Sequence, residues 1–264
     1  MFTSLVLSLS LTSLFDDSYV QRFIDAGFVG ILRTRSTSAP FNYDRSLSRE
    51  SDSSGLMIGM FQHATVRKAS SGLKNAAYGA AGYLPSVSFS GVLLGDQVFS
   101  HRRDGATVLL ARAGVYTSHV KVLYSKTSAE IGRGVRRNAN SGADAVLLER
   151  FTREKLGRLH GDTFAGAESV TINGTSVRDT ARSPDGVIYI RLQPWAQARG
   201  IAYTVDADEL TADLTVGGAT TRLLMLAPQT RRGGTWSDLN GRVYPVLRNG
   251  NWYVPYLAFE SITR

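Results

Sequence analysis

A repeated unit near the end of the chain is the strongest constraint on its fold. Residues 185–201 read DGVIYIRLQPWAQARGI, and residues 249–262 read NGNWYVPYLAFESI. Each stretch begins with a turn dipeptide, continues as a strand rich in β-branched and aromatic residues, and ends with apolar residues at helical spacing. We therefore predict that the last third of the chain contains two copies of one strand–helix module.

Composition limits the class of protein and its partners. The chain has 264 residues, 43% of them hydrophobic, which is enough for one large domain or two ordinary ones. It has no cysteine, which excludes disulfides, thiolate metal sites and cysteine nucleophiles. The net charge of +8 favours a polyanionic partner such as a teichoic-acid-bearing wall, nucleic acid or an anionic membrane. Because the basic runs are short, nucleic acid is not the expected partner, and a diffuse solubilising charge is the alternative.

The first fifteen residues, MFTSLVLSLSLTSLF, are apolar but do not follow the pattern of a signal peptide. They lack a positively charged start and a clear small-residue cleavage site. Residues 6–12 alternate apolar and hydroxyl side chains with period two, which predicts the first strand of a domain, with a signal peptide as the alternative. The stretch is too short and too rich in serine to cross a bilayer, so no transmembrane segment is expected.

Up to about residue 166, short apolar stretches alternate with helical ones. The predicted strands are 6–12, 28–35, 56–64, 89–94, 119–124 and 143–152, and the predicted helices are 16–27, 43–55, 70–84, 105–114 and 129–142. Alternation of this kind is typical of a parallel sheet covered by helices. The predicted fold class is therefore an α/β domain over residues 1–166, a small or degenerate β/α barrel.

Beyond residue 166 the pattern changes to short strands separated by glycine-rich turns. Asn-Gly pairs at 173–174, 240–241 and 249–250 are hairpin signals. We predict that residues 167–264 form an α+β accessory domain.

This second segment resembles a known module. The stretches VTINGTSV, VIYIRLQPWAQARG, ADLTVGG and NWYVPYLAFESI resemble the copper amine oxidase-like N-terminal domain of bacterial surface and wall-associated proteins. The resemblance covers residues 168–264 and implies a non-catalytic module that binds the wall or a partner. It does not imply a copper centre, since the segment has no histidine or cysteine. Because aromatic rings stack on sugars, the candidate ligand-binding residues are Tyr189, Trp195, Trp236, Trp252 and Tyr253. A position in the core is the alternative for each, as the amphipathic spacing around Trp195 indicates.

The first segment resembles the family-25 glycoside hydrolases, lysozymes common in phage endolysins and bacterial autolysins. The resemblance rests on SYVQRFIDAGFVGILRTRS, YDRSLSRESDSSGLMIGMFQHA, GVYTS and LLERFTREKLGRLHGDTFAG, which occur in the family's order over about 150 residues. It implies a β/α barrel that cleaves peptidoglycan.

The carboxylates that such cleavage needs are largely missing. A glycosidase places two carboxyl groups across the scissile bond. Ser8 and Ser10 occupy the first strand where the resemblance implies an acid, and the central Asp-x-Glu is absent. The remaining candidates for catalysis are Asp96 and Asp162, which could equally be solvated loop carboxylates, and Glu149, near the C-terminal end of a predicted strand.

No metal site or cofactor is expected. The four histidines have no metal-binding spacing, and no glycine-rich stretch has the order of a phosphate loop.

The predicted function is peptidoglycan binding by a lysozyme-like protein of bacterial or phage origin, with lost or altered muramidase activity. The alternative is a non-enzymatic structural protein of a virion or cell surface, with self-association or other surface proteins as partners. The expected location is extracellular, at the cell wall or in a virion, after a cytoplasmic stage before release.

Overall fold

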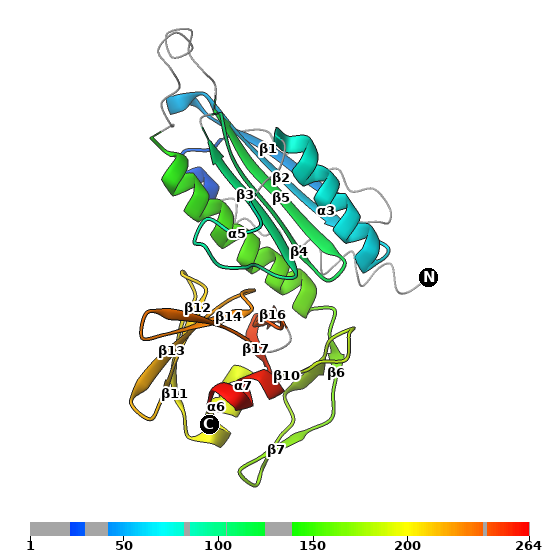
Figure 1. Ribbon diagram of the computed structural model, residues 1–264, viewed down its shortest axis with the longest axis vertical. Coiled ribbons are helices and arrows are strands. Elements are labelled where there is room, and N and C mark those ends of the chain that lie inside the picture. The colour runs from blue at the N-terminus through cyan, green and yellow to red at the C-terminus, as the bar shows by residue number, and fades with distance from the viewer. Residues whose placement is uncertain are drawn as a thin grey trace.

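The computed structural model describes residues 22–29, 42–81, 85–103, 105–124, 139–239 and 242–263. Antiparallel strands make up most of the fold, and a long helix runs between its two parts (Figure 1). The sequence predictions for residues 6–12, most of 28–35, half of 16–27, most of 129–142 and the Asn-Gly pair at 240–241 lie outside the described residues.

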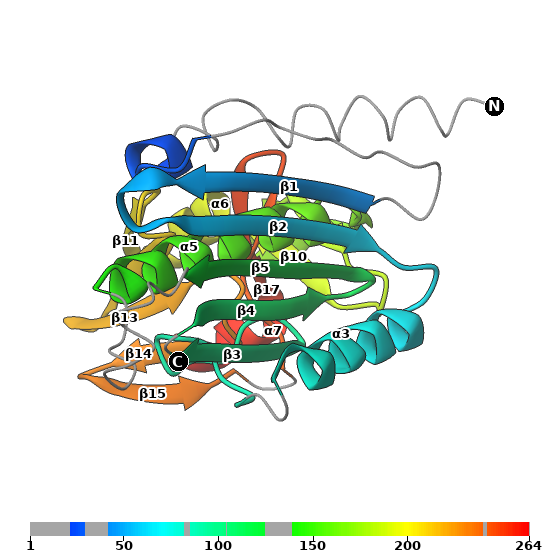
Figure 2. The ribbon, with the colours of Figure 1, turned by 90° about the horizontal axis from the view of Figure 1, so that it is seen from above.

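The first part is built on a five-stranded antiparallel sheet. Its strands follow the spatial order β1-β2-β5-β4-β3, which Figure 2 shows face-on. Their bounds are β1 Asn42–Arg49, β2 Ser54–Gln62, β3 Gln97–Arg103, β4 Ala106–Ala113 and β5 Tyr116–Tyr124. A short 3-10 helix, η1 (Glu50–Asp52), joins β1 to β2.

One helix covers each face of this sheet. Successive side chains of a strand point to opposite faces, and β4 is apolar on both. Val108 and Leu110 form a cluster with α3 (Val66–Ala81), whereas Leu109 and Ala111 belong to the larger core that includes α5 (Ser141–Gly161).

The second part contains two more five-stranded sheets and a hairpin. One sheet has the order β16-β17-β10-β9-β6, the other is the meander β11-β12-β13-β14-β15, and β7 pairs with β8. The bounds are β6 Ala165–Gly166, β7 Val170–Ile172, β8 Thr175–Val177, β9 Thr180–Arg182, β10 Ile188–Arg191, β11 Ala202–Asp206, β12 Thr211–Val216, β13 Ala219–Leu224, β14 Gln229–Arg232, β15 Thr235–Asp238, β16 Val246–Arg248 and β17 Asn251–Pro255. Two short helices, α6 (Leu192–Arg199) and α7 (Tyr256–Ile262), lie side by side near the C-terminus (Figure 1).

The repeated sequence unit forms a strand and a helix both times. Strand β10 leads directly into α6, and β17 leads directly into α7. The two strands pair antiparallel, with Ile190 opposite Val254, so the two copies face each other. Each helix packs on the strand of the other copy, and the rings of Trp195 and Phe259 meet edge to face at 5.8 Å.

The predicted fold class is wrong. A β/α barrel requires parallel neighbouring strands joined by helices, but every strand pair of the first sheet is antiparallel. The described residues of the second part are likewise dominated by antiparallel sheets, with two short helices, and do not form the α+β module that the sequence led us to expect.

Four element predictions account for this error. Residues 43–55 and 105–114, predicted as helices, form strands β1 and β4, and residues 143–152, predicted as a strand, lie within α5. Residues 89–94 form turns and bends rather than a strand. In β4 the apolar run is continuous because both faces are buried, and such a run has no period that separates a strand from a helix.

Helix α5 joins the two parts of the chain. It packs on β4 and β5 of the first sheet and on β16 of the second. Its residues Gly157 and Gly161 allow close approach, since a Cβ on Gly161 would lie 2.1 Å from the carbonyl oxygen of Leu247. One apolar core therefore runs from the first sheet through this helix into the second part.

Candidate functional site

A pocket of about 550 Å³ lies where the two parts meet. Its walls come from the end of β2 and the start of α3, the end of β4 with the turn into β5, the C-terminal end of α5, the turn before β10 with the start of that strand, and residues 242–244. Asp96, which immediately precedes β3, also lines it.

Asp96 holds the pocket together. Its Oδ2 accepts hydrogen bonds from Nη1 of Arg112 at 2.7 Å and from the backbone N–H of Gly114 at 2.8 Å. Its Oδ1 accepts a bond of 3.0 Å from the hydroxyl of Tyr244, whose pKa burial raises well above its ordinary value. Because these three donors come from both parts of the chain, Asp96 links the parts and has little capacity left to act on a substrate.

Two mostly buried residues, His160 and Tyr116, line the pocket, and their polar side-chain atoms are open to it. As whole residues, His160 is 8% exposed and Tyr116 is 6% exposed. Among the described residues, no group forms a hydrogen bond with either ring nitrogen of His160 or with the Tyr116 hydroxyl. The ring nitrogens of His160 and the hydroxyl of Tyr116 are therefore available to a ligand or to water.

Burial keeps both groups in their neutral forms. It lowers the pKa of His160, despite the opposing charges of Asp96 and Asp185, and it raises the pKa of Tyr116, as does the charge of Asp162. Neutral imidazole offers one donor and one acceptor, and a phenol offers both. The inner pocket therefore suits a ligand with hydroxyl or amide groups.

Gly114 makes room for the imidazole. A Cβ at this position would lie 2.7 Å from Nδ1 of His160, and the residue has φ of +58°. The ring of His160 also contacts Phe164, with centroids 5.0 Å apart, and Tyr244, with centroids 5.8 Å apart. The histidine is therefore held firmly by its neighbours.

Two opposite charges lie on the exposed part of the lining. Arg242 is exposed and has no ion pair or hydrogen bond to another described residue. Asp185 accepts a hydrogen bond from the Ser183 hydroxyl on one carboxylate oxygen. Arg242 and Asp185 do not form an ion pair with each other.

The predicted catalytic carboxylates do not come together. Asp96 lines the pocket, but Glu149 lies on α5, where it pairs with Arg153 and accepts a hydrogen bond of 3.0 Å from the backbone N–H of Ser90. Asp162 follows α5 and accepts a hydrogen bond of 2.9 Å from the backbone N–H of Asn249. Glu149 and Asp162 both connect segments of the fold.

The five predicted ligand-binding aromatics are mostly in the core. Tyr189 is buried but lines the pocket. Trp195 is fully buried, and Trp252 and Tyr253 are nearly so. Trp236 is partly exposed, with the guanidinium of Arg231 5.7 Å from its ring.

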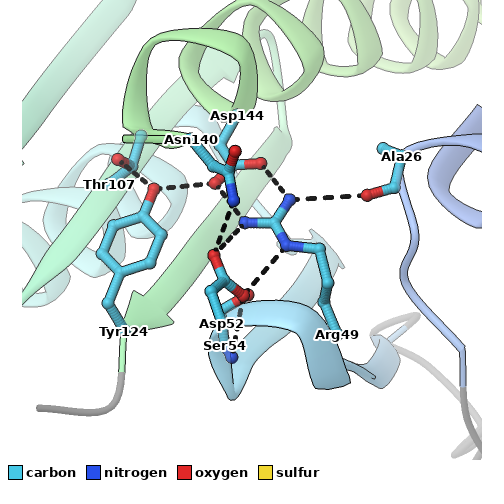
Figure 3. Close-up of polar contacts among 8 residues, drawn as sticks. All are labelled: Ala26, Arg49, Asp52, Ser54, Thr107, Tyr124, Asn140 and Asp144. Carbon is cyan, nitrogen blue, oxygen red and sulfur yellow. Dashed lines mark hydrogen bonds and ion pairs between the residues drawn. The ribbon is translucent and has the colours of Figure 1, made fainter. Parts of the chain in front are cut away.

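A second polar cluster, shown in Figure 3, lies where the β1–β2 connection meets the start of α5. Arg49 donates to both carboxylate oxygens of Asp144, at 2.8 and 2.9 Å, and to both of Asp52, at 3.0 and 2.8 Å. Tyr124 and Asn140 complete the cluster through hydrogen bonds of 2.9 Å to Asp144 and Asp52. Since these groups satisfy one another, the cluster has the features of a structural joint.

Among the described residues, no group of three or more metal-ligating side chains comes together. Nor does any helix within the described ranges have the length and apolar character needed to span a membrane. Comparison with known protein families, with curated proteins and with solved structures found no match.

Sequence reasoning identified Asp96 and Tyr189 as candidates but missed most of the pocket. Tyr116, His160, Asp185 and Arg242 come from segments that are far apart in the chain and share no motif. Only the fold brings them together.

Proposed function

We propose that the protein binds peptidoglycan in this pocket without cleaving it. The observation that carries the proposal is a pocket of about 550 Å³ into which His160 and Tyr116 present polar atoms that bond to no described residue. Sugars and peptides present the hydroxyl and amide groups that such side chains bind, and the tyrosine rings add apolar surface. The net charge of +8 supports a polyanionic wall as the setting.

The arrangement of carboxylates argues for binding rather than hydrolysis. A glycosidase needs one carboxylic acid that donates a proton and a second carboxylate across the bond. In this pocket, Asp96 is already bonded to Arg112, Gly114 and Tyr244, which leaves it poorly placed to protonate a leaving group. Asp185 is solvent-exposed, whereas the catalytic acid of a glycosidase lies in apolar surroundings. The protein would act outside the cell, at the wall.

Cosedimentation with purified, insoluble peptidoglycan tests this function. We expect the wild-type chain to sediment with the polymer and to release no reducing ends. Tyr116→Phe keeps the ring but removes the unpartnered hydroxyl, and we expect it to bind about tenfold more weakly. Tyr78→Phe removes an exposed hydroxyl on α3, away from the pocket, and should bind like wild type.

Three outcomes would count against the proposal. Release of reducing ends would show that the chain hydrolyses the polymer. Equal losses of peptidoglycan binding in Tyr116→Phe and Tyr78→Phe would show that binding does not take place in this pocket. Absence of cosedimentation would favour the alternative, a structural protein of a virion or cell surface.

A further inference from the structure

The charges of the pocket divide into an inner pair that is neutralised and an outer pair that is not. Arg112 and Asp96 form an ion pair of 2.7 Å, so neither offers a free charge to a ligand. Arg242 and Asp185 line the same pocket, and neither forms an ion pair with a described residue. The pocket therefore presents one available cation and one available anion.

The carboxylate of Asp185 is held in place by its turn. The backbone N–H of Gly186 donates to the carbonyl oxygen of Ser183 at 2.9 Å, and that of Val187 donates to the Ser183 hydroxyl oxygen at 3.0 Å. The same hydroxyl donates to Oδ1 of Asp185. Oδ2 of Asp185 is therefore left for a ligand cation.

We infer that the pocket binds a zwitterionic peptide segment, with a ligand carboxylate at Arg242 and a ligand ammonium at Asp185. The inference rests on the proposed function and assigns recognition to the peptide part of the wall polymer rather than to its glycan. Tyr116 and His160 supply neutral donors and acceptors for the amide groups between the two charges.

Ligands with one kind of charge fit the pocket less well. A phosphate-rich polymer would meet the carboxylate of Asp185, and a polycation would meet the guanidinium of Arg242. A neutral sugar would cover both charges without pairing either, which is unfavourable. A ligand with both charges forms a charge-assisted hydrogen bond at each end.

The test measures the binding of Nα-acetyl-L-lysyl-D-alanine to the full chain by calorimetry, with its side-chain amine and carboxylate free, with that amine acetylated and with the carboxylate amidated. We expect each modification to weaken binding to wild type about tenfold, the loss of one charge-assisted bond. Arg242→Gln should no longer distinguish carboxylate from amide, and Asp185→Asn should no longer distinguish amine from acetamide.

Control variants remove similar charges elsewhere. Arg232→Gln and Glu168→Gln change exposed residues outside the pocket lining and should keep the wild-type preferences. The inference fails if modified and free dipeptides bind equally, if none binds, or if the controls lose the preferences as fully as the pocket variants do.

Peptidoglycan stripped of its peptides by an amidase separates this inference from the proposed function. Binding to intact but not to stripped polymer supports both. Equal binding to the two forms leaves wall binding in place and overturns the peptide assignment. If neither polymer binds but the dipeptide does with the expected preferences, the pocket assignment stands and the proposed function fails.

Discussion

At the scale of single residues, burial makes the stability of this protein depend on pH. It lowers the pKa of His63, His119 and His160, and that of His119 falls to about 4. Among the described residues, Nε2 of His119 has no hydrogen-bond partner, and its ring lies 4.8 Å from that of Phe61. The folded chain therefore binds these protons less readily than the unfolded chain does.

We expect the free energy of unfolding to fall as the pH drops from 6.5 towards 4. The unfolded chain protonates His119 near its ordinary value of 6.5, whereas the folded chain does so only near 4. From pH 7.5 to pH 5, this one group accounts for a loss of about 2 kcal/mol. His119→Phe keeps a ring against Phe61, and urea denaturation at the two pH values should show a smaller loss. An unchanged pH dependence would assign the effect to other groups.

Gly114 is expected to be required for the position of His160. Gly114→Ala adds a Cβ 2.7 Å from Nδ1 of His160 at a residue with φ of +58°. Gly217→Ala is its matched control, because φ is +57° there and nothing lies within 4 Å of the added atom. Both variants should lose about 1 kcal/mol to the backbone conformation. Thermal denaturation and cosedimentation should show a further loss of stability and of wall binding in Gly114→Ala only; equal effects would contradict the role of this contact.

The candidate site was only partly predictable at this scale. Asp96 was selected because it follows an apolar stretch, and it does line the pocket, but as a residue that joins three donors. His160 gave no signal because its significance comes from its place in the wall of the pocket. Such a property depends on contacts between distant segments, which a single sequence does not reveal.

At the scale of elements, the sequence-based predictions were correct for helices and strands that have one buried face or a clear stop signal. Residues 70–84 overlap α3, residues 56–64 overlap β2, and both strand–helix repeats were recognised. The prediction failed in β4, because burial of both faces removes the alternation of apolar and polar side chains that marks a strand. It also failed in α5, where residues 143–152 were predicted as a strand although they are part of a longer helix. Predicting β4 as a helix and part of α5 as a strand produced an apparent alternation of strands and helices. This alternation led to the incorrect prediction of a barrel.

The Arg49 cluster joins the β1–β2 connection to α5, and its loss should be costly. Arg49→Met would leave Asp144, which is 1% exposed, without its guanidinium partner. Breaking a buried ion pair on one side typically lowers stability by about 3–5 kcal/mol. The control Arg222→Met breaks the exposed two-bond pair with Asp213 and should lose less than about 1 kcal/mol. Urea denaturation checks both values, and similar losses would contradict the structural role of the cluster.

At the scale of the whole molecule, the proposed binding site depends on how the two parts fit together. The pocket takes Tyr116 from the first sheet and Tyr244 from the second part, with His160 of α5 between them in sequence. Asp96 bonds to Arg112 on one side and Tyr244 on the other. A change that separated the parts would therefore open the pocket without altering any residue that lines it.

The close contact between α5 and β16 provides such a change. Gly161→Ala would place a Cβ 2.1 Å from the carbonyl oxygen of Leu247, so the helix and the strand must move apart. Overpacking of this kind lowers stability by about 1–3 kcal/mol. The control Gly142→Ala lies in the same helix with nothing within 4 Å and should be neutral or slightly stabilising.

All three tryptophans, Trp195, Trp236 and Trp252, lie in the second part, so their fluorescence reports on that part while far-ultraviolet circular dichroism reports on both. In urea, the two signals should change together for wild type and Gly142→Ala. For Gly161→Ala we expect a lower midpoint, transitions that no longer coincide, and weaker cosedimentation with peptidoglycan. Coincident transitions at the wild-type midpoint would show that this contact does not couple the two parts.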